Sequence, residues 1–269
     1  MKKYTIFGNP VEHSKSPQMH NAGFDFLKFN GYYDKTLLKD GNNIKKVFLE
    51  NNFYGANITV PHKEYAFTNA DEVIGLASKI KAVNTYIKKD NKILAYNTDA
   101  PGFIKAIEEF EPIKKALILG AGGTARAISV ALYDKGVDTT VLNRSVSKRD
   151  FFIDLGVKFY DWDGMRLQFL ADLPSYDIII NSTSAGLKDE QYPAPMELLN
   201  PLIKNSKYAI DCIYGKETPF LSLAKKNKII SKDGEDMLLY QGVLAFELFT
   251  GVKADDSLVE AMRRGLKKT

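Results

Sequence analysis

Short apolar runs alternate with amphipathic stretches along most of the chain, and this alternation predicts an α/β fold. We expect a first strand at Tyr4–Gly8. A helix should begin at Ser16, with the serine as N-cap and Pro17 at the first helical position. A second helix is expected over residues 43–51.

Strict alternation of apolar and polar residues then predicts a strand. Period two places Ala56, Ile58 and Val60 on one face of this strand, and Asn57 and Thr59 on the other. The proline that follows should end it.

A predicted hairpin closes the first region. Strands over 83–88 and 92–96 flank a polar turn at 89–91. The second strand ends in the polar triplet 97–99, and Pro101 opens another helix.

A second region begins near residue 115. An apolar strand at 116–119 runs into a glycine-rich turn, a helix to about residue 135 and a strand at 139–142. Further strands are expected near 158–160, 177–180, 208–213 and 229–230.

The last segment predicts two helices, 234–249 and 257–266, with no strand between them. We therefore expect two α/β domains with a cleft between them. The first comprises residues 1–100 plus 237–269, and the second residues 101–236.

Composition narrows the class of protein. The chain has 269 residues, of which 45% are hydrophobic and 26% charged, so it is not a disordered polymer. Its net charge of +4 is scattered, and the densest basic cluster is Arg263, Arg264, Lys267 and Lys268. This pattern excludes a nucleic-acid-binding stripe and agrees with a small anionic ligand.

Cysteine and histidine usage adds two expectations. Cys212 is the only cysteine in the sequence, so no disulfide can form within the chain, and the three histidines show no metal-binding spacing. No metal centre is expected. The sequence also has no signal-peptide core and no membrane-length apolar run, which favours a cytoplasmic protein without a membrane partner.

The most specific motif is a glycine turn of the form G-x-G-x-x-A, placed between a strand and a helix. Glycines permit the tight turn and a close approach to a pyrophosphate, and the helix amino terminus favours the phosphates. The motif predicts a dinucleotide site with contacts from Gly120, Ala121, Gly122, Gly123 and Thr124.

The next strand ends about 20 residues later in Asn143, Arg144 and Ser145. NAD-binding chains usually place a carboxylate there to accept from the ribose 2′-hydroxyl. Here a guanidinium can instead bind a 2′-phosphate, and Lys148 adds positive charge. The strand end therefore favours NADP over NAD.

Polar residues of the first domain stand at the ends of predicted elements. Taken singly, each has an ordinary structural interpretation as a cap or turn residue. Together they suit a small polyhydroxylated anion. The set is Ser14, Ser16, Asn57, Thr59, Lys63, Asn84 and Asp99.

Several of these segments resemble the shikimate dehydrogenase family. The motifs are residues 8–17 (GNPVEHSKSP), 55–63 (GANITVPHK), 82–85 (AVNT) and 96–102 (YNTDAPG). The glycine turn, 143–145, 181–183 and the late set Asp233, Gly234, Met237 and Gln241 continue the match in order. The resemblance extends from about residue 4 to residue 250.

This resemblance implies a substrate-binding domain and a Rossmann-type NADP-binding domain. It implies the reversible reduction of 3-dehydroshikimate to shikimate by NADPH, a step in chorismate and aromatic amino-acid biosynthesis. The chain would act as a monomer or a homodimer. Lys63 and Asp99 are similar to the family's catalytic pair.

The remaining roles also follow from the resemblance. Ser14 and Ser16 match the hydroxyls that bind the substrate carboxylate, with Tyr214 near them. Asn57, Thr59, Asn84 and Gln241 match readers of the ring hydroxyls. The glycine turn, Asn143, Arg144, Ser145 and Lys148 match the NADP site, and Thr183, Cys212, Gly234 and Met237 would lie along its nicotinamide side.

Gln241 can also be argued from its position. It lies on an apolar helical stripe, where a buried amide needs hydrogen-bond partners. A ligand contact and a structural bond to a carbonyl both satisfy that need.

Three alternatives stay open at this point. One is a dual quinate/shikimate dehydrogenase that uses NAD or NADP. Another is a non-catalytic nucleotide-sensing relative, because fold does not fix function. A third is a folate-type dehydrogenase of similar layout, which would lack the Ser14/Ser16 pair.

Overall fold

The computed structural model describes residues 1–110 and 112–267, and the chain divides into two compact units. Unit 1 comprises Met1–Gly102 and Leu238–Thr269, and unit 2 comprises Phe103–Met237. The boundaries fall inside helices α5 (Asp99–Ala106) and α11 (Glu235–Thr250). Lys268 of the predicted basic cluster and the last residue of the predicted first domain, Thr269, lie outside the described residues.

The described part of unit 1 is built on a six-stranded mixed sheet with the order β2-β1-β3-β5-β6-β4. β1 pairs in parallel with β2 and β3, whereas β5 runs antiparallel to β3 and β6. The strands are β1 Lys2–Gly8, β2 Gly31–Leu37, β3 Gly55–Ile58, β4 Glu72–Val73, β5 Thr85–Lys89 and β6 Lys92–Tyr96.

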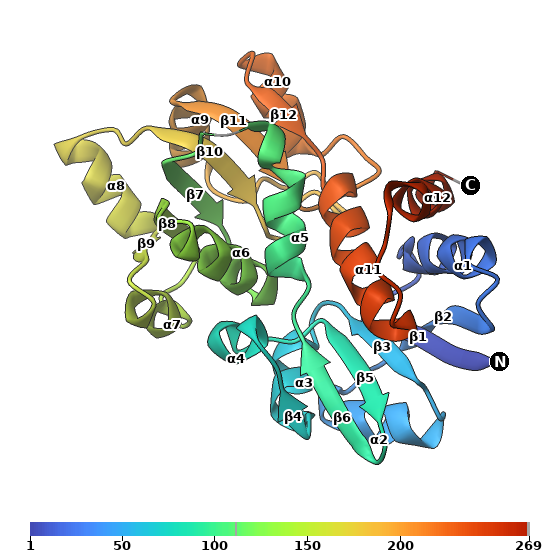
Figure 1. Cartoon of the computed structure of the whole chain (residues 1–269). Coiled ribbons are helices and arrows are strands. Elements are labelled where there is room, and N and C mark those ends of the chain that lie inside the picture. The colour runs from blue at the N-terminus through green and yellow to red at the C-terminus, as the bar shows by residue number, and fades with distance from the viewer. Residues whose placement is uncertain (111, 268–269) are drawn as a thin grey trace. The chain divides into compact units, whose positions relative to one another are not determined.

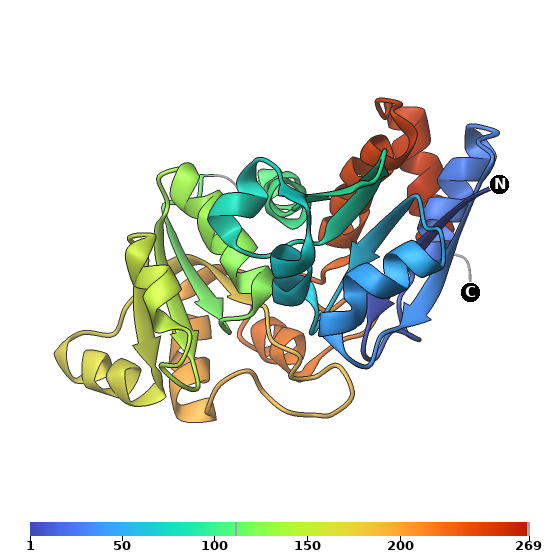
Figure 2. The same cartoon turned by 90° about the horizontal axis from the view of Figure 1, so that it is seen from below.

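Helices bury both faces of this sheet. On one face α1 and α12 lie side by side (Figures 1 and 2), and Tyr4, Phe24 and Phe246 share their core. On the other, Phe7 and Phe48 belong to a second core. β1 therefore contributes apolar side chains to both faces. The helices are α1 Ser16–Phe26, α2 Ile44–Glu50, α3 Lys63–Asn69, α4 Leu76–Ile80, α11 and α12 Asp256–Leu266.

Three local predictions for unit 1 are wrong. Pro101 is the third residue of α5, which begins at Asp99, rather than its first. Ser16 is the first residue of α1 rather than its cap, because Lys15 takes the N-cap position. The alternation over 56–60 also misleads: β3 ends at Ile58, and Val60 is 59% exposed instead of sharing the buried face of Ala56. The chain turns there through a cis peptide bond before Pro61.

Unit 2 contains an all-parallel sheet with the order β12-β11-β10-β7-β8-β9 in the described residues. The chain starts in the middle at β7, moves outward to β9 and returns to β10 on the other side of β7. This is the doubly wound Rossmann order. The strands are β7 Lys115–Leu119, β8 Asp138–Asn143, β9 Lys158–Asp161, β10 Tyr176–Asn181, β11 Ser206–Asp211 and β12 Ile230–Lys232.

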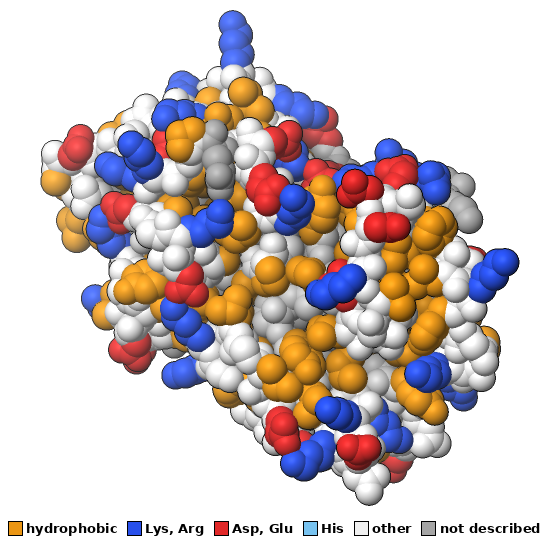
Figure 3. Space-filling model, in the orientation of Figure 1, with side chains coloured by type: hydrophobic (Ala, Val, Ile, Leu, Met, Phe, Trp, Pro, Cys, Tyr) orange, Lys and Arg blue, Asp and Glu red, His pale blue; other side chains and the backbone are white. Residues whose placement is uncertain are grey.

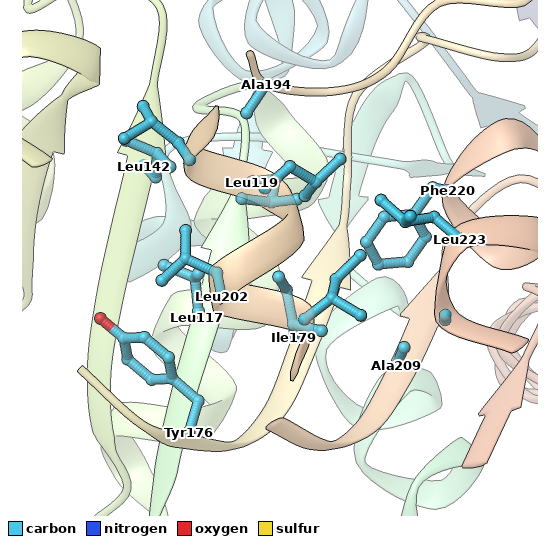
Figure 4. Packing of buried hydrophobic residues seen from close by; sticks show 14 of the residues in the cluster. Leu117, Leu119, Leu142, Tyr176, Ile179, Ala194, Leu202, Ala209, Phe220 and Leu223 are labelled. Carbon is cyan, nitrogen blue, oxygen red and sulfur yellow. The ribbon is translucent and has the colours of Figure 1, made fainter. Parts of the chain in front are cut away.

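The core of unit 2 is aliphatic. Figure 4 shows Leu117, Ile179 and Ala209 from neighbouring strands facing Leu202 and Phe220 from two covering helices. The sequence of a strand that is buried on both faces is a nearly continuous apolar run. For this reason the positions of these strands could be predicted. The helices of unit 2 are α6 Gly123–Asp134, α7 Arg149–Asp154, α8 Trp162–Ala171, α9 Met196–Lys204 and α10 Pro219–Lys226.

The surface carries mixed charge. On the face that Figure 3 shows, basic and acidic side chains are interspersed rather than gathered by sign. Within residues 1–110 and 112–267, no helix has both the length and the apolar character needed to span a bilayer.

Candidate active site

Unit 1 gathers its polar residues at one edge of its sheet. β1, β3 and β6 all end at this edge, because β3 is parallel to β1 and two antiparallel pairings restore the direction at β6. β5 starts there, with Thr85 opposite both Asn57 and Tyr96. The register thus brings segments distant in sequence to one place.

Lys63 and Asp99 meet at this edge. Lys63 begins α3 and Asp99 begins α5, and the Lys63 Nζ lies 2.5 Å from Oδ2 of Asp99. Their side chains are only 11% and 6% exposed, so water competes little with the contact. Asn97 fixes the start of α5, because its Oδ1 accepts from the backbone N–H groups of Asp99 and Ala100.

Asn84 joins the pair to the neighbouring amides. Its Nδ2 lies 2.9 Å from Oδ1 of Asp99, 2.9 Å from Oγ1 of Thr98 and 3.3 Å from Oε1 of Gln241. Its Oδ1 accepts from the backbone N–H of Thr98 at 2.8 Å. Asn84 therefore has no freedom to rotate its amide without losing several bonds.

Gln241 reaches this cluster from α11. Its Nε2 donates to the Leu238 carbonyl at 2.7 Å, which leaves Oε1 toward Asn84. The approach of α11 to α5 requires Gly102, where an added Cβ would lie 2.6 Å from the backbone nitrogen of Gln241. Both interpretations of the buried amide therefore keep support: it has a carbonyl partner and it faces the polar cluster.

Asn57 is held by residues of two strands, β2 and β5, and by Asn84, which directly precedes β5. The Tyr33 hydroxyl donates to its Oδ1 at 2.7 Å, and its Nδ2 donates to Oγ1 of Thr85 at 3.1 Å and to the Asn84 carbonyl at 3.3 Å. Thr59 comes after β3 and is half-buried. Its methyl group would meet an added Cβ on Gly8, so it lies against the end of β1.

Ser14 and Ser16 form a separate pair at the amino end of α1. The Ser14 Oγ accepts from the Ser16 backbone N–H at 3.3 Å, and both residues are buried. Pro17 carries no N–H, and the 11-residue helix adds the positive end of its dipole. A carboxylate would be stabilised there.

Unit 2 places the glycine turn where its motif predicts. Gly120 follows β7 with a φ of +102°, a conformation that L-residues rarely adopt. Gly122 is the N-cap of α6, and an added Cβ there meets no atom within 4 Å. Open space beside a helix amino terminus fits a pyrophosphate. Ala121 is buried, and Gly123 and Thr124 start the helix.

The end of β8 carries the predicted 2′-phosphate group. Asn143 is its last residue, and the Asn143 Nδ2 donates to the Ser145 carbonyl at 2.8 Å. This bond closes a tight turn that leaves Arg144 exposed. Lys148 is exposed at the N-cap of α7.

The four residues expected along the nicotinamide belong to the carboxyl ends of the unit 2 sheet or to α11. Thr183 follows β10 and touches Gly120, and Cys212 follows β11. Gly234 packs against the Cys212 backbone, and Met237 is buried. Tyr214 is half-buried in the same unit, so its predicted place beside Ser14 and Ser16 stays a prediction.

Three supporting residues were missed. Asn97 carried a signal, since asparagine is favoured at helix N-caps. Tyr33 and Thr98 carried none, because they become partners of Asn57 and Asn84 only through the sheet register. In the described part of the chain, no cluster of three or more metal-ligating side chains is found.

Comparison with known proteins identifies the family. Residues 6–86 match the shikimate dehydrogenase substrate binding domain, and residues 234–266 match the shikimate 5′-dehydrogenase C-terminal domain. The shikimate dehydrogenase (NADP(+)) of Helicobacter hepaticus is 45% identical over 261 residues, which are 97% of this chain and 95% of that protein. The chain belongs to the shikimate dehydrogenase family.

Solved structures of this family share the fold. Shikimate dehydrogenase from Aquifex aeolicus superposes with a TM-score of 0.85 at 31% identity, covering 100% of this chain and 98% of that one. The Thermus thermophilus enzyme, solved with NADP(H) and shikimate, gives 0.81 at 33% identity over 98% and 100%. The family membership and the α/β fold class predicted from the sequence are confirmed.

Proposed function

We propose that this chain catalyses the reversible reduction of 3-dehydroshikimate to shikimate with NADPH, as an oxidoreductase of aromatic amino-acid biosynthesis. The observation that carries the proposal is the buried contact between Lys63 and Asp99 among fixed amides. Curated relatives with this activity in their names align over more than nine-tenths of the chain.

The substrate would be oriented by hydrogen bonds at the edge of the unit 1 sheet. The hydroxyls of Ser14 and Ser16 suit the carboxylate, and Tyr214 would add a third hydroxyl. Asn57, Thr59, Asn84 and Gln241 suit the ring hydroxyls, since amides and hydroxyls can both donate and accept. Fixed polar partners of this kind discriminate strongly against analogues that lack a hydroxyl.

Lys63 supplies the proton. When bound, NADPH supplies the hydride to the C3 carbonyl carbon of the substrate. As that carbon is reduced, the Lys63 Nζ donates a hydrogen bond to the developing alkoxide and then transfers its proton to the oxygen. In the oxidation direction the same amine takes the proton back.

Asp99 orients that amine. Its Oδ2 accepts from Lys63 and its Oδ1 from Asn84, so both carboxylate oxygens are engaged and the amine is held in one direction. In the bound state a neighbouring substrate hydroxyl could share one of these oxygens. Pre-organised donors of this kind lower a barrier without reorganisation during the reaction.

The cofactor would bind on unit 2. The turn formed by Gly120, Ala121, Gly122, Gly123 and Thr124 would hold the pyrophosphate. Asn143, Arg144, Ser145 and Lys148 would surround the 2′-phosphate, and Thr183, Cys212, Gly234 and Met237 the nicotinamide side. The guanidinium of Arg144 is exposed, and the space beside Gly122 is open. Both features favour a turn that binds NADP over a glycine-rich turn that binds no ligand.

The test is a spectrophotometric assay at 340 nm with the purified chain. Shikimate and quinate are each supplied with NADP and with NAD. We expect turnover with shikimate and NADP. The ratio of this rate to the rate with quinate measures selectivity for the substrate, and its ratio to the rate with NAD measures selectivity for the cofactor. Absence of turnover with every pair would favour a nucleotide-sensing relative and contradict the proposal.

Location and assembly belong to the same proposal. We propose a cytoplasmic enzyme, because the reaction draws on an NADPH pool maintained by metabolism. A monomer or a homodimer is proposed, and light scattering at micromolar concentration separates the two.

A further inference from the structure

A series of hydrogen bonds runs from a buried carboxylate in unit 2 to Thr183, which lies beside the glycine turn. Asp211 is the last residue of β11 and is fully buried. Both of its carboxylate oxygens lie 3.1 Å from Nδ2 of Asn181, the last residue of the neighbouring β10. The Oδ1 of Asn181 then accepts from the backbone N–H and the hydroxyl of Thr183, at 3.0 and 2.8 Å.

This arrangement gives the Asn181 amide a single orientation. An ionised carboxylate only accepts hydrogen bonds, so it must face the amide NH₂ group. The amide oxygen is thereby turned toward Thr183. A flipped amide would set its oxygen against the carboxylate and its NH₂ against the two donor groups of Thr183.

The far end of this series lies at the predicted cofactor site. A Cβ added to Gly120 would come within 2.8 Å of the Thr183 methyl group and 3.0 Å of the Ser182 hydroxyl. The Ser182 hydroxyl donates to the Leu119 carbonyl at 2.7 Å, which ties the two turns together. These turns follow β7 and β10, between which the strand order reverses, and dinucleotides bind at such points.

Other groups hold Asp211 in place. The Thr218 hydroxyl donates to it at 2.6 Å and the Ile213 backbone N–H at 2.9 Å. Burial raises the pKa of Asp211 to about 6, and the nearby negative charge of Asp233 acts in the same direction. Burying a carboxylate costs free energy. If this position served only to pack the interior of unit 2, an apolar side chain would do so without that cost.

We propose that Asp211 is a positioning residue for the cofactor: through Asn181 it holds Thr183 against the glycine turn, and it touches neither substrate nor cofactor. The inference rests on the proposed function, since it assumes that NADPH binds at this turn. It assigns a role to a carboxylate that the mechanism does not use.

The test is direct titration of NADPH, followed by its fluorescence, without substrate. Asp211→Asn keeps the shape of the side chain but places an NH₂ group among donors, so the Asn181 amide loses its fixed orientation. We expect the Kd for NADPH to rise about tenfold. In steady state the KM for NADPH should rise equally, with kcat and the KM for 3-dehydroshikimate changed less than threefold.

Asp177→Asn is the matched control. Asp177 lies near the start of β10, the strand that ends in Asn181, and its carboxylate also accepts backbone N–H groups, from Lys114 and Lys115. This variant should bind NADPH as the wild type does. A general loosening of unit 2 would instead weaken NADPH binding in both variants and would overturn the inference.

A second variant covers the case in which Asp211→Asn does not fold. Thr183→Val removes the hydroxyl bond to Asn181 at a half-buried position and should raise the Kd for NADPH at least threefold. Wild-type affinity in either folded variant overturns the inference and leaves the proposed function standing. A wild-type chain that does not bind NADPH overturns both.

Discussion

The Nζ atom of Lys63 lies 2.5 Å from Oδ2 of Asp99, although 36 positions separate the two residues. Both stand at the first turn of a helix, and both are buried. An exposed pair of this kind contributes little to stability. Here the two side chains are also bonded into a network of amides, so the contact fixes the direction of a proton donor.

Lys63→Ala tests that assignment. We expect kcat to fall by about 10²–10⁴-fold, which is the usual contribution of a positioned acid or base, with the KM for shikimate changed less than threefold. Lys45→Ala is the control, because Lys45 forms an ion pair with Asp71 at the surface of the same unit. An equal loss in kcat and in substrate affinity would contradict the proton-transfer role.

Tyr33→Phe tests how Asn57 is oriented. The substitution removes only the hydroxyl that donates to Oδ1 of Asn57 at 2.7 Å. A lost bond of this strength, about 1 kcal/mol, should raise the KM for shikimate about fivefold and leave kcat within twofold. The comparison variant is Tyr32→Phe, since Tyr32 is 47% exposed. An unchanged KM in Tyr33→Phe would show that Asn57 keeps its orientation without the phenol.

Arg144→Ala tests the cofactor preference. Loss of the guanidinium that contacts the 2′-phosphate should weaken the binding of NADPH by about tenfold or more, and the binding of NADH by less than twofold. The measurement is the KM for each cofactor at saturating 3-dehydroshikimate. Arg149→Ala, five residues further on and also exposed, should change neither value. Equal losses for both cofactors would remove the 2′-phosphate from the proposal.

How much the sequence predicts depends on how local each feature is. The strand, glycine turn and helix over 115–134 are contiguous, so their pattern alone predicts them. The contact between Lys63 and Asp99 depends on the register of β3, β5 and β6, and only the family resemblance brought the two together. Likewise, no spacing rule links Tyr33 to Asn57 or Asp211 to Asn181.

The wrong predictions have physical reasons of the same kind. Val60 satisfies a period-two pattern, but the strand ends at Ile58. The alternation of apolar and polar residues therefore continues for two residues beyond the strand. Ser16 has the chemistry of an N-cap, but Lys15 already lies in the turn and the helix begins at the serine. Local preference was overruled in both cases by the path of the chain around the polar edge.

His20 predicts how stability depends on pH. Its ring is buried and stacked on Tyr33 with ring centroids 4.3 Å apart, and the effect of burial on its pKa outweighs the opposite effect of the Asn57 side chain. Burial lowers the pKa of His20 to about 3 from its ordinary value of 6.5. The unfolded chain therefore binds more protons than the folded chain between these values, and stability falls as the pH falls through that window.

From pH 7 to pH 5 this difference amounts to about 2 kcal/mol of unfolding free energy for His20 alone. His20→Leu removes the titration, so its urea-unfolding free energy should decline less over that range, by about the same amount. His13→Gln is the control, because His13 is exposed. This substitution should leave the dependence of the unfolding free energy on pH as it is in the wild type. If His20→Leu declines as steeply as the wild type, the ring is not held neutral by burial, and acid sensitivity must come from other groups.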